Sequence, residues 1–116
     1  MFCTVKLNSE ILVGTVVQFD ASSQMWSVAL NHNETIGVIS EAASQDDEGQ
    51  WWARVTFAGI SFAIADRAIP DQGGKLNVAN GRVYVDNTTD TNGIVAPVSR
   101  GQTSRLVNDL VMVDIR

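Results

Sequence analysis

The sequence predicts an all-β fold, a small single-domain β-barrel, β-tulip-like barrel or sandwich of eight or nine short strands with an extended N-terminal arm. A length of 116 residues suits one compact domain. Apolar residues alternate with a period of two in several segments, whereas no segment keeps a helical period over a full helix length. Turn-forming residues recur about every 8 to 12 residues, which is typical of all-β domains.

Period-two alternation predicts five strands in the first half of the chain. Polar turns at 20–24 and 31–34 separate the first three strands, and an acidic loop at 44–50 precedes the fourth. Ala58-Gly59 predicts a hairpin between the fourth strand and the fifth. The expected strands are 11–19, 26–30, 36–39, 51–57 and 60–65.

The second half begins with the turn-rich segment Pro70-Asp71-Gln72-Gly73-Gly74. Two strands, 75–78 and 82–86, follow it around an Asn80-Gly81 turn. Asn92-Gly93 predicts another hairpin turn, because Asn and Gly tolerate a positive φ. The final segment, 106–115, is rich in β-branched residues two positions apart, which favours a strand over a helix.

The first dozen residues are expected to form the arm, and residues 13–116 the domain. The arm is apolar, and the sequence offers it no partner strand within the chain. We therefore expect it to pair with a sheet edge of another protein or another copy. Its candidate interface residues are Phe2, Val5, Leu7, Ile11 and Leu12.

Composition narrows the classes of partner. The formal net charge is -5, and no basic stripe is present to bind phosphates, so we expect no nucleic acid partner. No apolar run approaches the roughly 20 residues that span a bilayer, and the start lacks the pattern of a signal peptide. We expect no membrane partner and synthesis in the cytosol. Apolar residues make up 45% and charged residues 18%, which predicts that part of the surface is covered.

The residues that usually carry catalysis are scarce. His32 is the single histidine and lies between two asparagines in a predicted turn, and Cys3 is the single thiol. The polar segment 86–93 lacks the first Asp and the bidentate Glu of a calcium loop. We expect no enzyme, no catalytic residue, no cofactor and no metal site. A small hydrolase is the weakest alternative.

Trp51-Trp52 is the most suggestive local feature, because tryptophans are common in interfaces and sugar-binding modules. Adjacent strand residues point to opposite faces, so the two indoles do not form one platform. Trp51 shares its face with apolar residues and is expected in the core. Trp52 shares its face with Arg54, and these two residues complete the candidate interface; either a loop or another subunit covers Trp52.

The order of these signals resembles that of the head-decoration, or cement, proteins of tailed bacteriophages. The resemblance covers roughly residues 12 to 115 but not the acidic insert 46–48 or the polar loop 87–92. Its segments are Gly14-Thr15-Val16-Val17, Trp26-Ser27-Val28-Ala29-Leu30, Ile36-Gly37-Val38-Ile39, Val55-Thr56-Phe57-Ala58-Gly59, Ala63-Ile64-Ala65, Ile69 to Leu76, Asn80-Gly81-Arg82-Val83 and Leu110 to Ile115.

The resemblance implies a β-barrel or β-tulip domain on the outer surface of a virion capsid. There a homotrimer would cross-brace subunits of the major capsid protein, and the N-terminal arm would pair with a capsid strand or a neighbouring copy. The alternative is a phage tail or fibre module that recognises a host surface or carbohydrate. That module would use Tyr84, Trp52 and the loop tips at 31–34 and 87–92.

Overall fold

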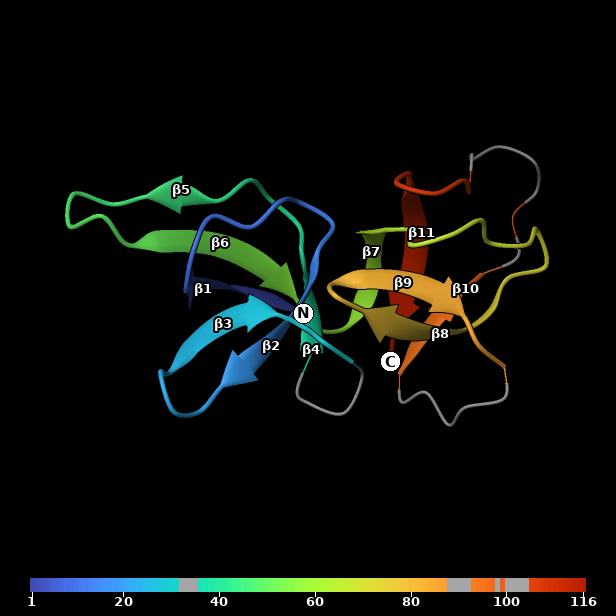
Figure 1. Cartoon of the computed structure of the whole chain (residues 1–116), viewed down its shortest axis with the longest axis horizontal. Helices are drawn as coiled ribbons and strands as arrows, with labels where there is room; N and C mark the ends of the chain where they lie inside the picture. Colours follow the sequence, from blue (N-terminus) through green and yellow to red (C-terminus); the bar gives the residue numbers. More distant parts are fainter. Residues whose placement is uncertain (32–35, 88–92, 98, 100–104) are drawn as a thin grey trace.

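The computed structural model describes residues 1–31, 36–87, 93–97, 99 and 105–116, which form eleven β-strands and no helix (Figure 1). The all-β prediction is confirmed. There are more strands than the eight or nine expected, in part because the predicted arm and the predicted acidic loop each contain a strand. The molecule is elongated, with extents of 45 × 27 × 23 Å. No helix long and apolar enough to cross a membrane is present among these residues.

The first six strands form a barrel, at the left of Figure 1. Hydrogen bonding runs in the order β1-β3-β2-β4-β6 and closes through pairing of β6 with β1. The short β5 pairs with the beginning of β6, at Trp51 and Trp52, whereas β4 pairs with the end of β6. The bounds are β1 (Phe2–Leu7), β2 (Val16–Asp20), β3 (Met25–Val28), β4 (Ile36–Ile39), β5 (Ser44–Gln45) and β6 (Trp51–Thr56).

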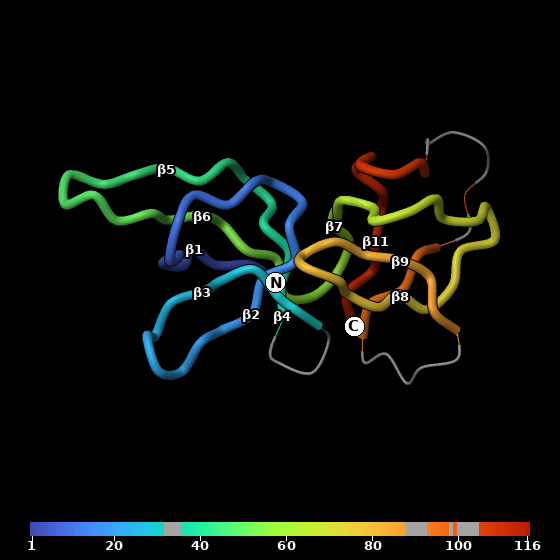
Figure 2. Tube along the Cα trace, in the orientation of Figure 1, coloured from blue at the N-terminus to red at the C-terminus, as the bar shows by residue number. Residues whose placement is uncertain are grey.

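The last five strands form a second sheet in the order β7-β11-β10-β8-β9. The sheet curls so that Ala65, just beyond β7, bridges to Val83 of β9. Figure 2 shows that the chain completes the barrel before it builds this sheet. The bounds are β7 (Gly59–Ile64), β8 (Gly74–Ala79), β9 (Arg82–Val85), β10 (Ile94–Ala96) and β11 (Leu110–Ile115).

The N-terminal residues have a partner within the chain, which corrects the expected free arm. β1 pairs antiparallel with β6 over its whole length, from Phe2 opposite Thr56 to Leu7 opposite Trp51. It also meets β3 in parallel, with Leu7 opposite Trp26. The segment is extended as predicted, but it forms part of the barrel wall.

The predicted hairpin at Ala58-Gly59 is also wrong. β6 and β7 follow each other in sequence but belong to different sheets, because β7 pairs with β11. Gly59 has a φ of +94°, which turns the chain out of the barrel. The turn at Asn80-Gly81 behaves as predicted: β8 and β9 pair around it, with φ of 48° and 79° at these residues. Of the second expected turn, Asn92 lies outside the described residues.

Two hydrophobic cores result, and neighbouring residues of the barrel wall contribute to different ones. Val17 and Ile39 point into the barrel, whereas the adjacent Val16 and Val38 point outward and pack in the core of the second sheet. All four are fully buried. This follows from the period of two along a strand. The barrel wall is therefore buried on both faces where the two sheets meet.

Candidate binding surface

The outer face of the β7–β11 pair is the most unusual surface of the molecule. Four large apolar side chains lie there, Ile60 (57% exposed), Phe62 (46%), Leu110 (46%) and Met112 (37%). Phe62 stands directly opposite Met112 across the two strands, and Leu110 stands opposite Ile64. We call these four exposed residues the β7–β11 face. Contiguous exposed apolar surface on a small domain is typical of an interaction site.

The placement of side chains along β7 is inverted relative to an ordinary half-buried strand. Its small residues, Ser61 and Ala63, point inward and are buried, while the larger Ile60 and Phe62 point to solvent. The interior beneath β7 is filled instead by Val111 and by barrel residues such as Val16. Sequence reasoning missed this face because alternation shows that a strand has two faces without showing which one is buried.

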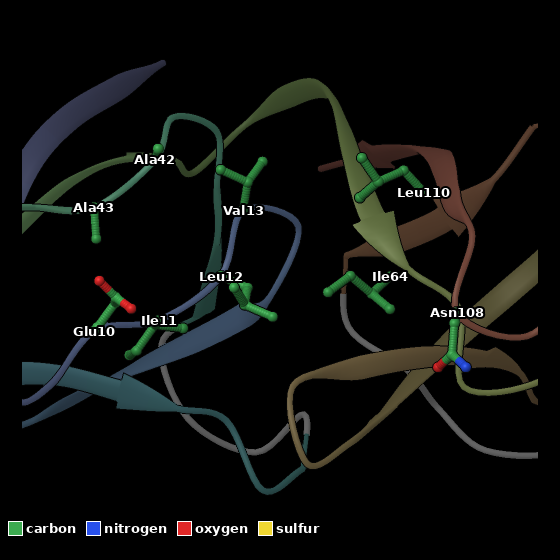
Figure 3. A pocket seen from close by; sticks show the side chains of 9 residues that line it. All are labelled: Glu10, Ile11, Leu12, Val13, Ala42, Ala43, Ile64, Asn108 and Leu110. Atoms are coloured by element: carbon green, nitrogen blue, oxygen red, sulfur yellow. The ribbon is translucent and has the colours of Figure 1, made fainter.

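A groove adjoins the face at the junction between barrel and second sheet. Its main cavity has a volume of about 500 Å³. Figure 3 shows Leu12 and Val13 reaching toward this space from the barrel side, and Ile64 and Leu110 from the other. A second hollow of about 260 Å³ shares Val13 and Leu110 with the first, so the groove continues along β7.

Gly14 lies at a junction between the barrel and the second sheet. The Ile64 amide donates a hydrogen bond to the Gly14 carbonyl at 2.9 Å, and the Gly14 amide donates to Ile39 at 2.9 Å. A Cβ at Gly14 would lie 2.4 Å from Leu110 Cδ2, and the φ of Gly14 is +89°. Only glycine therefore fits between β7 and the barrel here.

Charge is sparse in the groove. Glu10 is the single charged residue that lines the main cavity, and the hollow beside β7 has none. Within the described part of the chain, the Glu10 carboxylate forms no ion pair. The groove thus combines apolar walls with a carboxylate that forms no ion pair, and a further hollow of about 260 Å³ beside it is lined by both Glu10 and Arg82.

The candidate interface residues of the N-terminal segment fall into two groups. Leu7 and Ile11 are buried in the barrel core, and Val5 packs against it. These three are not available to a partner, which corrects the prediction, because β1 closes the barrel and turns them inward. Leu12 is 71% exposed and lines the groove, so it remains a candidate.

Phe2 and Arg54 lie together on the outer face of the barrel. The Arg54 guanidinium carbon lies 4.4 Å from the centre of the Phe2 ring. Arg54 also forms a salt bridge of 2.7 Å with Glu41, and both side chains are substantially exposed. An exposed pair of this kind stabilises a fold by about 1 kcal/mol at most. Neither residue lines the groove beside the β7–β11 face.

The β5–β6 hairpin provides an intramolecular partner for Trp52. Its indole Nε1–H donates a hydrogen bond of 2.8 Å to a carboxylate oxygen of Asp46. The same carboxylate accepts from the amides of Gln50 and Glu48. These bonds, led by that from Gln50, lower the pKa of Asp46 below its ordinary value. The contact favours the loop over a second subunit as the cover of Trp52. Trp51 packs against the barrel core as predicted.

The features suggested for glycan recognition are dispersed. The Arg67 guanidinium lies 4.2 Å from the ring centre of the half-buried Tyr84, on the second sheet and away from Trp52. Residues 32–35 and 88–92, which include His32 and most of both loop tips, lie outside the described residues.

The described residues contain no group of three or more His, Cys, Asp or Glu arranged to hold a metal ion. Their most distinctive chemistry is apolar surface next to an exposed strand edge. Comparison with models of known protein families, with curated proteins and with solved structures finds no match for this chain.

Proposed function

We propose that this chain is a non-enzymatic structural protein of a phage virion, which binds the outer surface of the capsid and stabilises the shell. The β7–β11 face is the proposed contact surface, and the major capsid protein is the proposed partner. The order of sequence segments that resembles head-decoration proteins supports the virion context. A homotrimer is the proposed assembly.

The observation that carries this proposal is the inverted strand β7. Ile60 and Phe62 point outward, so their apolar area stays in contact with water in the isolated chain. A partner that covers the face removes this area from water, which contributes favourably to the free energy of binding. Each contact can be small, because many sites on a repeated lattice add through avidity.

The experiment is co-sedimentation of the purified protein with undecorated capsids of the phage that encodes it, together with its mass in solution. We expect saturable binding at a fixed copy number and a shell that resists heat to a higher temperature. Phe62→Lys and Met112→Lys should each weaken binding about tenfold or more, because a charge is then desolvated at the contact.

Leu30→Lys is the matched control, since Leu30 is 64% exposed and lies outside both the face and the groove. Its binding should equal that of the wild type. A protein that ignores capsids contradicts the proposal. Binding of the isolated protein to host cells or glycans instead would favour the alternative of a tail or fibre recognition module.

A further inference from the structure

The backbone of β7 has an unpaired edge beside the groove. In an antiparallel strand, alternate residues direct both backbone groups to the same side. The amide of Ala65 donates to Asp109, toward β11, whereas that of Ile64 donates to Gly14 on the opposite side. The backbone groups of Phe62 and Ile60 therefore also point away from β11. Within the described residues, neither amide has a backbone acceptor.

The sequence of β7 has none of the features that normally protect an exposed strand. Natural edges carry a charged side chain, a proline or a bulge that blocks pairing with another chain. β7 reads GISFAI, with no charge and no proline, and its register with β11 is continuous. Such an edge can accept another strand through backbone hydrogen bonds.

The groove lies on the unpaired side of β7. The hollow beside it is lined by Ile60, Ser61 and Phe62 on one wall and by Ile39 and Thr56 on the other. At its end, the turn from Leu12 to Thr15 closes the edge at Ile64, whose amide donates a hydrogen bond to the Gly14 carbonyl. An extended segment beside Phe62 and Ile60 would form the backbone hydrogen bonds that this turn does not make.

The lining indicates the side chains that such a segment would carry. Apolar walls suit an apolar residue at every second position, because alternate residues of a strand face the same side. The unpaired carboxylate of Glu10 at the main cavity suits one Lys or Arg.

We infer that β7 binds an extended segment of a partner protein as an added strand in this groove, with alternating apolar residues and one basic residue. The inference rests on the proposed function and names its mode of binding: a capsid protein would insert an extended arm or loop. Backbone bonds to Phe62 and Ile60 would give affinity, and the groove walls with Glu10 would give specificity.

The test begins with selection of binders from a library of random ten-residue peptides. We expect an enriched family with alternating apolar positions and one Lys or Arg. Binding of the best peptide should slow hydrogen exchange of the Phe62 and Ile60 amides about tenfold or more. Phe62→Pro should weaken binding to a similar extent, because proline lacks the N–H donor and no backbone bond among the described residues depends on it.

Two matched probes separate backbone pairing from other effects. The same peptide should lose binding to the wild-type protein when N-methyl groups block the alternate amides that would face β7. This comparison holds even if the Phe62→Pro variant does not fold. Glu10→Gln should weaken binding of the basic peptide several-fold. It should not change the binding of a peptide that has Gln in place of the basic residue.

Three outcomes would overturn the inference. These are the absence of an enriched family, equal binding of the N-methylated peptide, and protection of the Phe62 amide that rises with protein concentration without peptide. The last would assign the edge to a second copy of the chain. If capsid binding persists after any of these outcomes, the proposed function stands without the inferred mode of binding. If the protein binds the peptide but not the capsid, the proposed virion function is contradicted and the inference about the groove stands.

Discussion

The barrel and the second sheet use apolar residues in opposite ways. The barrel contains all three tryptophans, and its core includes Trp26 and has Trp51 packed against it. Trp26 lies 5.2 Å from Phe57 between ring centres. The core of the second sheet contains only aliphatic side chains, and its one phenylalanine, Phe62, points to solvent. The first and last strands of the barrel also pair with each other, β1 with β6. In the second sheet, the edge of β7 stays open beside the groove.

Under the proposed function, this difference separates stability from binding within one small chain. Closure of the barrel removes exposed strand edges and buries Trp26, which favours a rigid scaffold. The second sheet depends on the barrel, because Val16 and Val38 of the barrel wall fill its core. It is then free to present large apolar side chains outward. The following four predictions test this division, from the largest expected effect to the smallest.

The cores of the two sheets should be equally important for stability and should unfold together. Ile39→Ala in the barrel and Leu76→Ala in the second sheet should each lower the free energy of unfolding by about 2–5 kcal/mol, because both side chains are fully buried. Tryptophan fluorescence reports on the barrel alone, and far-UV circular dichroism on both sheets. Their urea transitions should coincide in each variant. A Leu76→Ala transition seen by dichroism before fluorescence would show that the two sheets unfold independently.

Arg105 should be the most important charged residue for the second sheet. It is 7% exposed, and its guanidinium donates hydrogen bonds to the carbonyls of Pro70, at 2.7 Å, and Pro97. Arg105→Ala leaves both carbonyls without this donor and should lower the free energy of unfolding by about 3 kcal/mol in urea titration. Arg67→Ala, at an exposed position, should change it by about 0.5 kcal/mol or less. Equal losses in the two variants would contradict this role.

Gly14 should matter at the junction for two separable reasons. Gly14→Ala should cost about 2 kcal/mol in thermal or urea unfolding, from the positive φ and from the clash with Leu110. Gly49→Ala is the matched control: its φ is +81°, and a Cβ there would approach nothing closer than 3.6 Å. It should cost about 1 kcal/mol, from conformation alone. Leu110→Ala should recover part of the Gly14→Ala loss, and a strictly additive double mutant would argue against the clash.

The hydrogen bond between Trp52 and Asp46 should produce a local response to acid. Because the pKa of Asp46 in the folded chain is below 3.8, its contribution to stability is present above that pH and is lost as the pH falls through the folded value. The Trp52 indole N–H signal in NMR spectra should shift in that acidic range. Asp46→Asn should abolish the shift, and Asp47→Asn should retain it, since Asp46 is the acceptor. An unchanged shift in Asp46→Asn would assign the response to another group.

Much of the local structure was predictable because its causes are local. The alternation at 36–39 and 82–86 and the Asn80-Gly81 turn correspond to β4, β9 and the hairpin observed between β8 and β9. Turn chemistry and the period of two act over a few residues, so the sequence reports them directly.

The candidate binding surface was only partly predictable. Of the candidate interface residues, Leu12 lies in the groove and Phe2 remains exposed, whereas Leu7 and Ile11 belong to the barrel core. An apolar segment at the start of a chain looks like a free arm until its partner strand is known. β1 finds that partner in β6, which lies more than forty residues away in sequence.

The sequence by itself determined that the chain is built of short strands, where several of the turns fall, and that apolar surface remains to be covered. Only the tertiary structure decided which strands pair and which face of each strand is buried. Pairing depends on contacts between residues far apart in the chain, and alternation is the same for either face. For that reason Val16 and Val17 enter different cores, and Phe62 lies outside while Ala63 lies inside.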